Sequence, residues 1–340
     1  MTEGAEHRPA PKGLFGRLVA AVRHKIFPAV QRRWFLVRER PEVQFALKAA
    51  QYAVLAGIVL YLGFKLSSVG WGAVLGALPE TPWFYLFFAL RFLALPVSEL
   101  AIYEILWSIP LMRHFTVFIR KRVYNFAVMG YSGEAFLTIW ARRKLNLSDK
   151  KIIVAVKDNN LLSALTSNAA TVLLIMLLAA TGGLKAGLDA FPGASYLFAL
   201  AFIVASVLVI AVATFREKLI ALPKGVMPRL LGVHGARQVM IIALHAAMYA
   251  SALPGAPMMA WLTFIALQLV LSRIPFLPNQ DIVYLGAALT LSPIVNASEA
   301  AVAGMLVAEA GLSQLTNALM FVVTAHHAWA SRTEENAAKG

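Results

Sequence analysis

Long apolar runs separated by short basic connections make up most of this chain from residue 43 onwards. The runs cover residues 43–64, 83–109, 152–180, 195–214, 238–253, 258–271 and 315–329. A helix of about 20 apolar residues is long enough to cross a bilayer once. The pattern predicts an all-α fold, a polytopic helical membrane protein in which about six of these seven runs are full spans.

Residues 113–157 form a segment that is basic at both ends. Apolar residues stand between Arg113 and the basic cluster 120–122, and again between that cluster and a second basic cluster at 142–144. Because Lys and Arg are retained on the cytoplasmic side of a membrane, this segment is not expected to cross the bilayer. It is predicted to dip in and return, and the alternative is that it lies flat on the membrane surface. Irregular backbone at membrane depth has to lie inside protein. Glu134 would then be a carboxylate within the membrane.

A second irregular segment lies near the end of the chain. Residues 272–281 are rich in turn-forming types and lead into the apolar runs 282–291 and 300–310, each too short to span. Two half-length helices that face each other are therefore predicted, as in transporters that hold charged groups near the membrane midplane. A single kinked span over 282–310 is the alternative. The prediction thus includes two re-entrant hairpins that enter from the cytoplasmic side.

The predicted span at 83–109 contains ionisable residues, which are costly inside a membrane and indicate function. Arg91 and Glu99 lie about 80° apart around an ideal helix, which would allow an intramembrane ion pair. Alternatively, Arg91 and Glu104 extend toward opposite interfaces. His245 stands alone in another apolar run, with no second ligand at metal spacing, so a packed histidine is expected there.

The composition supports the membrane class and defines the domains. Of the 340 residues, 59% are hydrophobic and 14% charged, and the mean hydropathy is +0.69, whereas soluble domains are about a quarter charged. The expected organisation is a basic amphipathic N-terminal segment over 1–42, one transmembrane domain over 43–330 and a polar tail over 331–340. The protein is expected in the inner membrane. The Lys and Arg residues before the first apolar run predict that its N-terminus lies on the cytoplasmic side.

The net charge of +14 identifies the expected partners. The basic residues stand in clusters beside apolar runs, with no basic stripe on a soluble module, so nucleic acid is not expected. Membrane lipids with anionic or glycosylated headgroups are the expected partners. A second copy of the chain or a biosynthetic enzyme is a further candidate.

Several signatures of membrane enzymes are missing from the sequence. The chain has no cysteine, no His-Glu-x-x-His zinc helix, no Gly-x-Ser-x-Gly nucleophile elbow and no phosphate loop. No cofactor, metal ligand or catalytic residue is therefore expected. The expected substrate-binding residues are the basic, polar and acidic residues of the two dipping segments and of the helix after the first. They are Arg120, Lys121, Arg122, Asn125, Gly133, Glu134, Asp158, Asn159, Pro278, Asn279, Gln280 and Asp281.

Several of these positions occur in a recognisable order. The order is Lys121, Asn125, Gly130-x-x-Gly133-Glu134, Ser163 with Asn168, and Ile274-Pro275-x-x-Pro278-Asn279-Gln280-Asp281. In these positions and in hydropathy order, residues 43–329 resemble the flippase-like membrane domain of the lysylphosphatidylglycerol synthase family. That family usually carries Pro-x-x-x-Gly-Gly-x-Gly followed by Glu at the last of these stretches. Without a soluble aminoacyl-transfer domain, the resemblance implies lipid handling or translocation and no lysyl transfer.

An integral inner-membrane lipid-handling protein, similar to a flippase or scramblase, is the function that these features favour. A polar or anionic headgroup is expected to enter between the two hairpins and to contact residues 120–122. Glu134 and Asp281 would bond its polar atoms inside. The alternative is a membrane-embedded enzyme or accessory subunit of lipid or polysaccharide biosynthesis, in which Glu134 or Asp158 is a general base.

Overall fold

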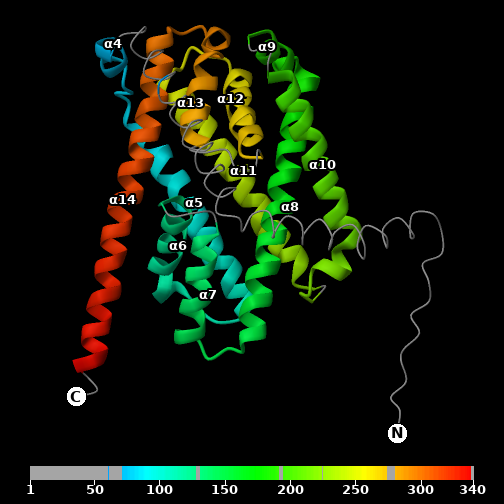
Figure 1. Ribbon diagram of the computed structural model, residues 1–340. Helices are drawn as coiled ribbons and strands as arrows, with labels where there is room; N and C mark the ends of the chain where they lie inside the picture. The colour runs from blue at the N-terminus through cyan, green and yellow to red at the C-terminus, as the bar shows by residue number, and fades with distance from the viewer. Residues whose placement is uncertain are drawn as a thin grey trace, which may run out of the picture. The chain divides into compact units, whose positions relative to one another are not determined.

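Helices make up every regular element that the computed structural model describes (Figure 1). The described residues are 60, 71–127, 131–190, 194–223, 225–273 and 280–337. The predicted amphipathic segment over 1–42 and most of the predicted first span over 43–64 lie outside this part of the chain, as do Pro278 and Asn279. The all-α class predicted from the sequence is confirmed.

The helices follow one another with short connections. In chain order they are α4 (Trp71–Gly76), α5 (Pro82–Trp107), η2 (Met112–His114), α6 (Phe115–Ala127), α7 (Ser132–Lys144), α8 (Asp149–Thr181), α9 (Gly183–Ala190), α10 (Ala194–Leu219), α11 (Met227–Ala252), α12 (Met258–Leu271), α13 (Gln280–Leu289), η3 (Ser292–Val295) and α14 (Glu299–Ala337). Helix α11 packs along α5, and α8 packs along α10.

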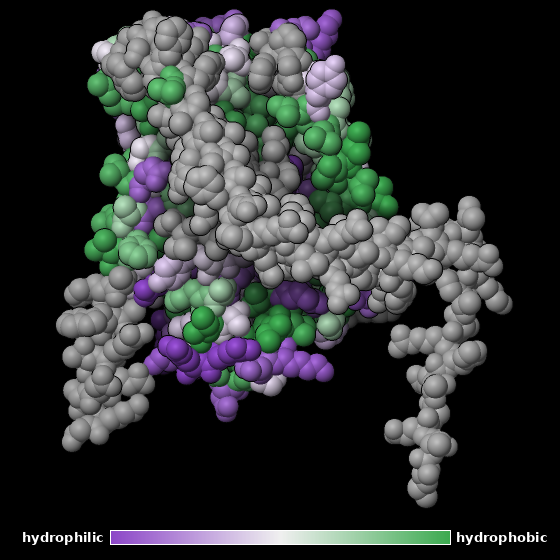
Figure 2. Space-filling view, in the orientation of Figure 1, coloured by the Kyte–Doolittle hydropathy of each residue, from purple (hydrophilic) through white to green (hydrophobic). Residues whose placement is uncertain are grey.

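Five of the described helices are long and apolar enough to cross a membrane. They are α5, α8, α11 and the segments Ser195–Leu219 of α10 and Glu299–Thr324 of α14. Large apolar side chains such as Leu173 and Val207 remain exposed on these helices, as expected of surfaces that face lipid tails. Figure 2 shows apolar surface above a hydrophilic end of the molecule. Arg142 and Arg143, in the last turn of α7, are exposed. The chain is therefore a multi-pass membrane protein.

The loop between α10 and α11 is short. The basic stretch 216–237 contains the turn-forming residues Pro223, Gly225 and Pro228, but most of it is helical, because α10 continues to Leu219 and α11 already begins at Met227. Pro228 lies in the first turn of α11, where its missing N–H costs no helical hydrogen bond. The Asp158 carboxylate accepts hydrogen bonds from the backbone N–H groups of Ala221 and Leu222, at 2.8 and 3.0 Å, and so fixes this loop against α8.

Helices α6 and α7 pack against each other as a hairpin within the segment that was predicted to dip into the bilayer. Two side chains help to close the turn between them: Asn125 Oδ1 accepts from the backbone N–H of Gly133 at 2.7 Å, and the Ser132 hydroxyl donates to the Tyr124 carbonyl at 2.6 Å. Gly133 also lets the two backbones approach closely. A Cβ atom at this position would lie 2.1 Å from the carbonyl oxygen of Lys121. Gly133 is therefore a packing residue of the hairpin.

Of the two half-length helices predicted for the second hairpin, the structure shows the first but not the second. Helix α13 is short, as expected, and it packs against α14, with a reversal at Asn296, which has a φ of 52°. The run 300–310, however, is not a half-length helix, because it continues through the predicted last span and part of the predicted polar tail as α14. No proline interrupts the chain after residue 293, so no residue forces the helix to end.

The packing at Gly133 leads to a stability prediction. Gly133→Ala is expected to lower the free energy of unfolding by about 1–3 kcal/mol, because the new Cβ overlaps the Lys121 carbonyl. Gly311→Ala is the control, since nothing lies within 4 Å of a Cβ there and alanine is the better helix former. Thermal unfolding of the purified protein in detergent measures both. Equal transition temperatures for the two variants would contradict this close approach.

Candidate functional site

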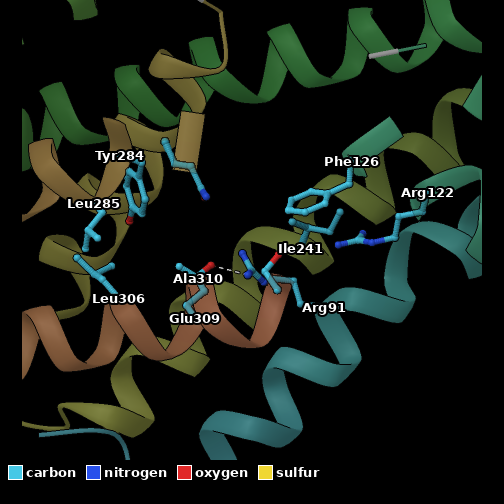
Figure 3. A pocket seen from close by; sticks show the side chains of 11 residues that line it. Arg91, Arg122, Phe126, Ile241, Tyr284, Leu285, Leu306, Glu309 and Ala310 are labelled. Carbon is cyan, nitrogen blue, oxygen red and sulfur yellow. Dashed lines mark hydrogen bonds and ion pairs between the residues drawn. The ribbon is translucent and has the colours of Figure 1, made fainter. Parts of the chain in front are cut away.

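A cavity of about 250 Å³ lies between helices from both halves of the described chain (Figure 3). Arg91 of α5 lies on its wall, beside Glu309 of α14. The other lining residues are Arg122 and Phe126 of α6, Ile241 of α11, Gln268 of α12, Tyr284 and Leu285 of α13, and Leu306, Ala310 and Ser313 of α14. One helix of the first hairpin and the short helix α13 thus contribute to the same cavity.

Arg91 and Glu309 form an ion pair on this wall. Arg91 Nη2 lies 2.5 Å from Glu309 Oε1, and Arg91 Nη1 lies 3.0 Å from His245 Nδ1 of α11. The predicted Arg91–Glu99 pair is therefore wrong, because Glu99 is bonded to Lys121 instead. The packing of α5 against distant helices decided this exchange of partners, which spacing within α5 could not reveal.

Two tyrosines extend the ion pair into a buried hydrogen-bond network. The Tyr249 hydroxyl donates to Glu309 Oε2 at 2.6 Å and lies 2.9 Å from the Tyr284 hydroxyl. The rings of Trp261 and Phe264 on α12 pack against Tyr249. Glu309 is thus held by several donors in an otherwise apolar setting, an arrangement that offsets the cost of burying its charge.

Lys121 is the centre of a second buried ionic cluster. Its ammonium group lies 2.5 and 2.6 Å from the two Glu99 oxygens and 3.1 Å from Glu134 Oε1, and the residue is only 1% exposed. Tyr103, also of α5, lies beneath the ammonium, whose nitrogen is 5.9 Å from the ring centre. The cluster therefore ties α5 to both helices of the hairpin.

Arg122 has no such counter-charge among the residues that the structure describes. Its guanidinium stacks on the Phe92 ring at 4.2 Å, and its Nε has no hydrogen-bond partner there. An arginine guanidinium stays protonated at neutral pH. Arg122 therefore brings to the cavity wall a positive charge that has no ion-pair partner among the described residues.

A polar stripe on α8 binds two further arginines. Arg237 of α11 donates to the Ser163 hydroxyl at 2.9 Å. Arg273, which follows α12, donates to the hydroxyls of Ser167 at 2.5 Å and Thr171 at 3.1 Å. These three α8 residues are spaced by four and so share one helix face. The hydroxyl groups orient the two guanidinium groups but do not neutralise their positive charge.

The other predicted binding residues with described side chains have structural contacts. Arg120 stacks on Tyr124 and reaches the Thr324 carbonyl of α14. Asn159 donates to the Tyr103 hydroxyl at 3.3 Å, while Asn125, Gly133 and Asp158 fix the hairpin and the loop described above. Lys121 and Glu134 belong to the second ionic cluster. Gln280 and Asp281 begin α13, but their side chains lie outside the described part.

Sequence reasoning missed most of the ionic network at the cavity. Glu309 lies inside the apolar run 300–310 and was not among the predicted site residues, although a single carboxylate in such a run is itself a signal of function. His245 was expected to be a packed histidine, and it is buried, but its two ionic neighbours come from other helices. Tyr249 and Tyr284 carry no signal in the sequence, because tyrosine is common in membrane helices.

Comparison with known proteins adds no assignment to this geometry. The chain matches no family model, no curated protein and no solved structure. The resemblance to the lysylphosphatidylglycerol synthase family therefore depends only on the sequence positions quoted above, and it remains an expectation. Any function has to be inferred from the cavity and its charges.

The second ionic cluster leads to a prediction on stability. Lys121→Met is expected to lower the free energy of unfolding by about 3–5 kcal/mol, because the buried Glu99 and the partly buried Glu134 lose their counter-charge. Adding Glu99→Gln to this variant should recover part of the loss. Lys150→Met, at an exposed position, is the control and should change stability by less than about 0.5 kcal/mol. Denaturant titration in detergent measures all three, and a neutral Lys121→Met would refute the structural role of the cluster.

Proposed function

We propose that this protein binds the phosphate of an anionic phospholipid headgroup in the cavity and moves that lipid between the leaflets of the inner membrane. The proposal depends on the position of Arg122. This half-buried cation lies on the cavity wall and has no carboxylate partner in the described residues. A lipid phosphate would supply the missing negative charge through charge-assisted hydrogen bonds.

The surroundings of the cavity support a lipid as the source of that phosphate. Phe126, Ile241, Leu285 and Leu306 line its remaining wall, and the helices around it expose apolar side chains to the bilayer. A headgroup could bind among the polar residues while its acyl chains stay in the membrane. A free anion would gain nothing from this apolar surface.

The hairpin α6–α7 suggests the direction of entry. Its last turn carries Arg142, Arg143 and Lys144, while Arg122 and Phe126 line the cavity nearer its tip. If these clusters stay on the cytoplasmic side, the hairpin enters the membrane from the cytoplasm and opens a polar route to the cavity. The N-terminus is then cytoplasmic as well.

A binding measurement tests the headgroup assignment. Purified protein in a nonionic detergent should bind a fluorescent phosphatidylglycerol more tightly than the matching diacylglycerol. Arg122→Gln should weaken phosphatidylglycerol binding by about 10-fold or more, since a hydrogen bond to a charged group contributes about 1.5–3 kcal/mol.

Arg143→Gln is the matched control, because Arg143 is exposed at the end of α7 and away from the cavity lining. This variant should bind as the unsubstituted protein does. Equal affinity for the two lipids, or equal losses in the two variants, would rule out headgroup recognition at Arg122. In liposomes, the same Arg122→Gln variant should slow phosphatidylglycerol scrambling. A new lipid product in mass spectra would favour the enzyme alternative.

Labelling tests whether the hairpin returns to the side that it entered from. The chain has no cysteine, so Tyr131→Cys, Arg143→Cys and Lys150→Cys each introduce a single thiol. Positions 143 and 150 should react with an impermeant maleimide from one face of sealed vesicles. Position 131, at the hairpin turn, should not react from the opposite face. Reaction there would mean that the segment crosses the membrane.

A further inference from the structure

The contacts of His245 determine its protonation state. A guanidinium group only donates hydrogen bonds, so Arg91 Nη1, 3.0 Å away, requires Nδ1 of His245 to be an acceptor without a proton. The proton of the neutral ring is then on Nε2, which lies 3.2 Å from Glu309 Oε1. While Arg91 stays in this position, His245 cannot take a second proton.

One cation and one carboxylate face His245 among the described residues, and the other groups nearby are neutral. Arg91 faces it from α5 and Glu309 from α14, while Tyr249 lies one turn further along α11 and bonds to Tyr284 of α13. Helix α12 brings the rings of Trp261 and Phe264 against Tyr249. Arg91 is therefore the one cation among the described groups that faces the ring, and Glu309 is the one carboxylate.

Arg91 and Glu309 also line the cavity, together with Arg122. Arg122 can bind an anion without giving up an ion pair, whereas Arg91 already contacts Glu309 and His245. A phosphate that binds both guanidinium groups has to draw Arg91 away from these two partners. Such a movement would leave the Glu309 carboxylate without its counter-charge, which is strongly unfavourable in a buried site.

We propose that His245 binds a proton when Arg91 turns to the lipid phosphate, so that one proton and one anionic headgroup bind together. This inference rests on the proposed function. The proton is taken up from the bulk solution and adds to Nδ1, and no covalent bond between heavier atoms forms or breaks. The imidazolium then takes the place of Arg91 as the counter-charge of Glu309. Arg91 and Arg122 together hold the phosphate.

Coupling of this kind is reciprocal. If the lipid-bound state holds one more proton than the free state, acid strengthens lipid binding to the same extent that the lipid strengthens proton binding. The expected dependence is at most about a tenfold gain in affinity for each unit that the pH falls, over the range in which His245 takes its proton. With the proton as co-substrate, a proton gradient would drive the lipid across the membrane.

The test measures phosphatidylglycerol binding by the full chain at about pH 5.5 and 7.5, a range in which histidine changes its charge and a phosphodiester does not. Unsubstituted protein should bind at least about fivefold more tightly at the lower pH. His245→Gln should lose this dependence but still bind at pH 7.5, because glutamine can accept from Arg91 and donate to Glu309. His234→Gln, a second buried histidine of α11, is the control and should keep the dependence.

A pH dependence that survives in His245→Gln would overturn the proposal. A second measurement needs no variant: phosphatidylglycerol added to weakly buffered protein should take up about one proton per lipid bound, and no uptake would also overturn it. Binding that needs Arg122 but does not change with pH would leave the proposed function intact and remove the coupling. Absence of phosphatidylglycerol binding at either pH would remove both. Dimethyl phosphate, a soluble phosphodiester, should cause no uptake, and an equal effect would overturn the lipid as the source of the anion.

Discussion

The pairing of charges between helices that are distant in sequence is the constraint on which this structure depends. A charge inside a bilayer or a helical bundle is tolerated when an opposite charge and hydrogen bonds surround it. Arg91 and Glu309 are 218 residues apart, and their contact fixes how α5 faces α14. Lys121 does the same for α5, α6 and α7 through Glu99 and Glu134. Apolar packing alone would leave these helices freer to rotate.

The same constraint explains why the cavity is a candidate site. Where a cation is paired directly with carboxylates, as at Lys121, the residues tie helices together. Arg122, Arg237 and Arg273 contact a ring or hydroxyl groups and no carboxylate within the described residues. Of these three, Arg122 lies on the cavity wall. Incomplete pairing at an accessible place is what distinguishes a binding surface from a structural ion pair.

The first hairpin links the two roles. Its turn is closed by Asn125 and Ser132, and Gly133 allows the close approach of α6 and α7. Lys121 then anchors the hairpin to α5, while the next residue, Arg122, lines the cavity. Adjacent positions on one helix thus serve packing and charge supply, because successive side chains point about 100° apart around the helix axis.

Local properties of the sequence determined the class of the protein, the approximate limits of α5, α8 and α10 and the first hairpin, because apolar runs and charge clusters act over one helix length. They also marked Arg91, as a charge in an apolar run, and Arg122, as a member of the basic cluster 120–122, since both patterns are visible without a structure. The partners were decided by tertiary packing. Glu309, Tyr249 and Tyr284 join Arg91 from three other helices, and no spacing within one helix specifies which helices meet. The continuity of α14 and the early start of α11 were likewise decided by the packed chain, because proline in a first turn and glycine in a long helix are compatible with either outcome.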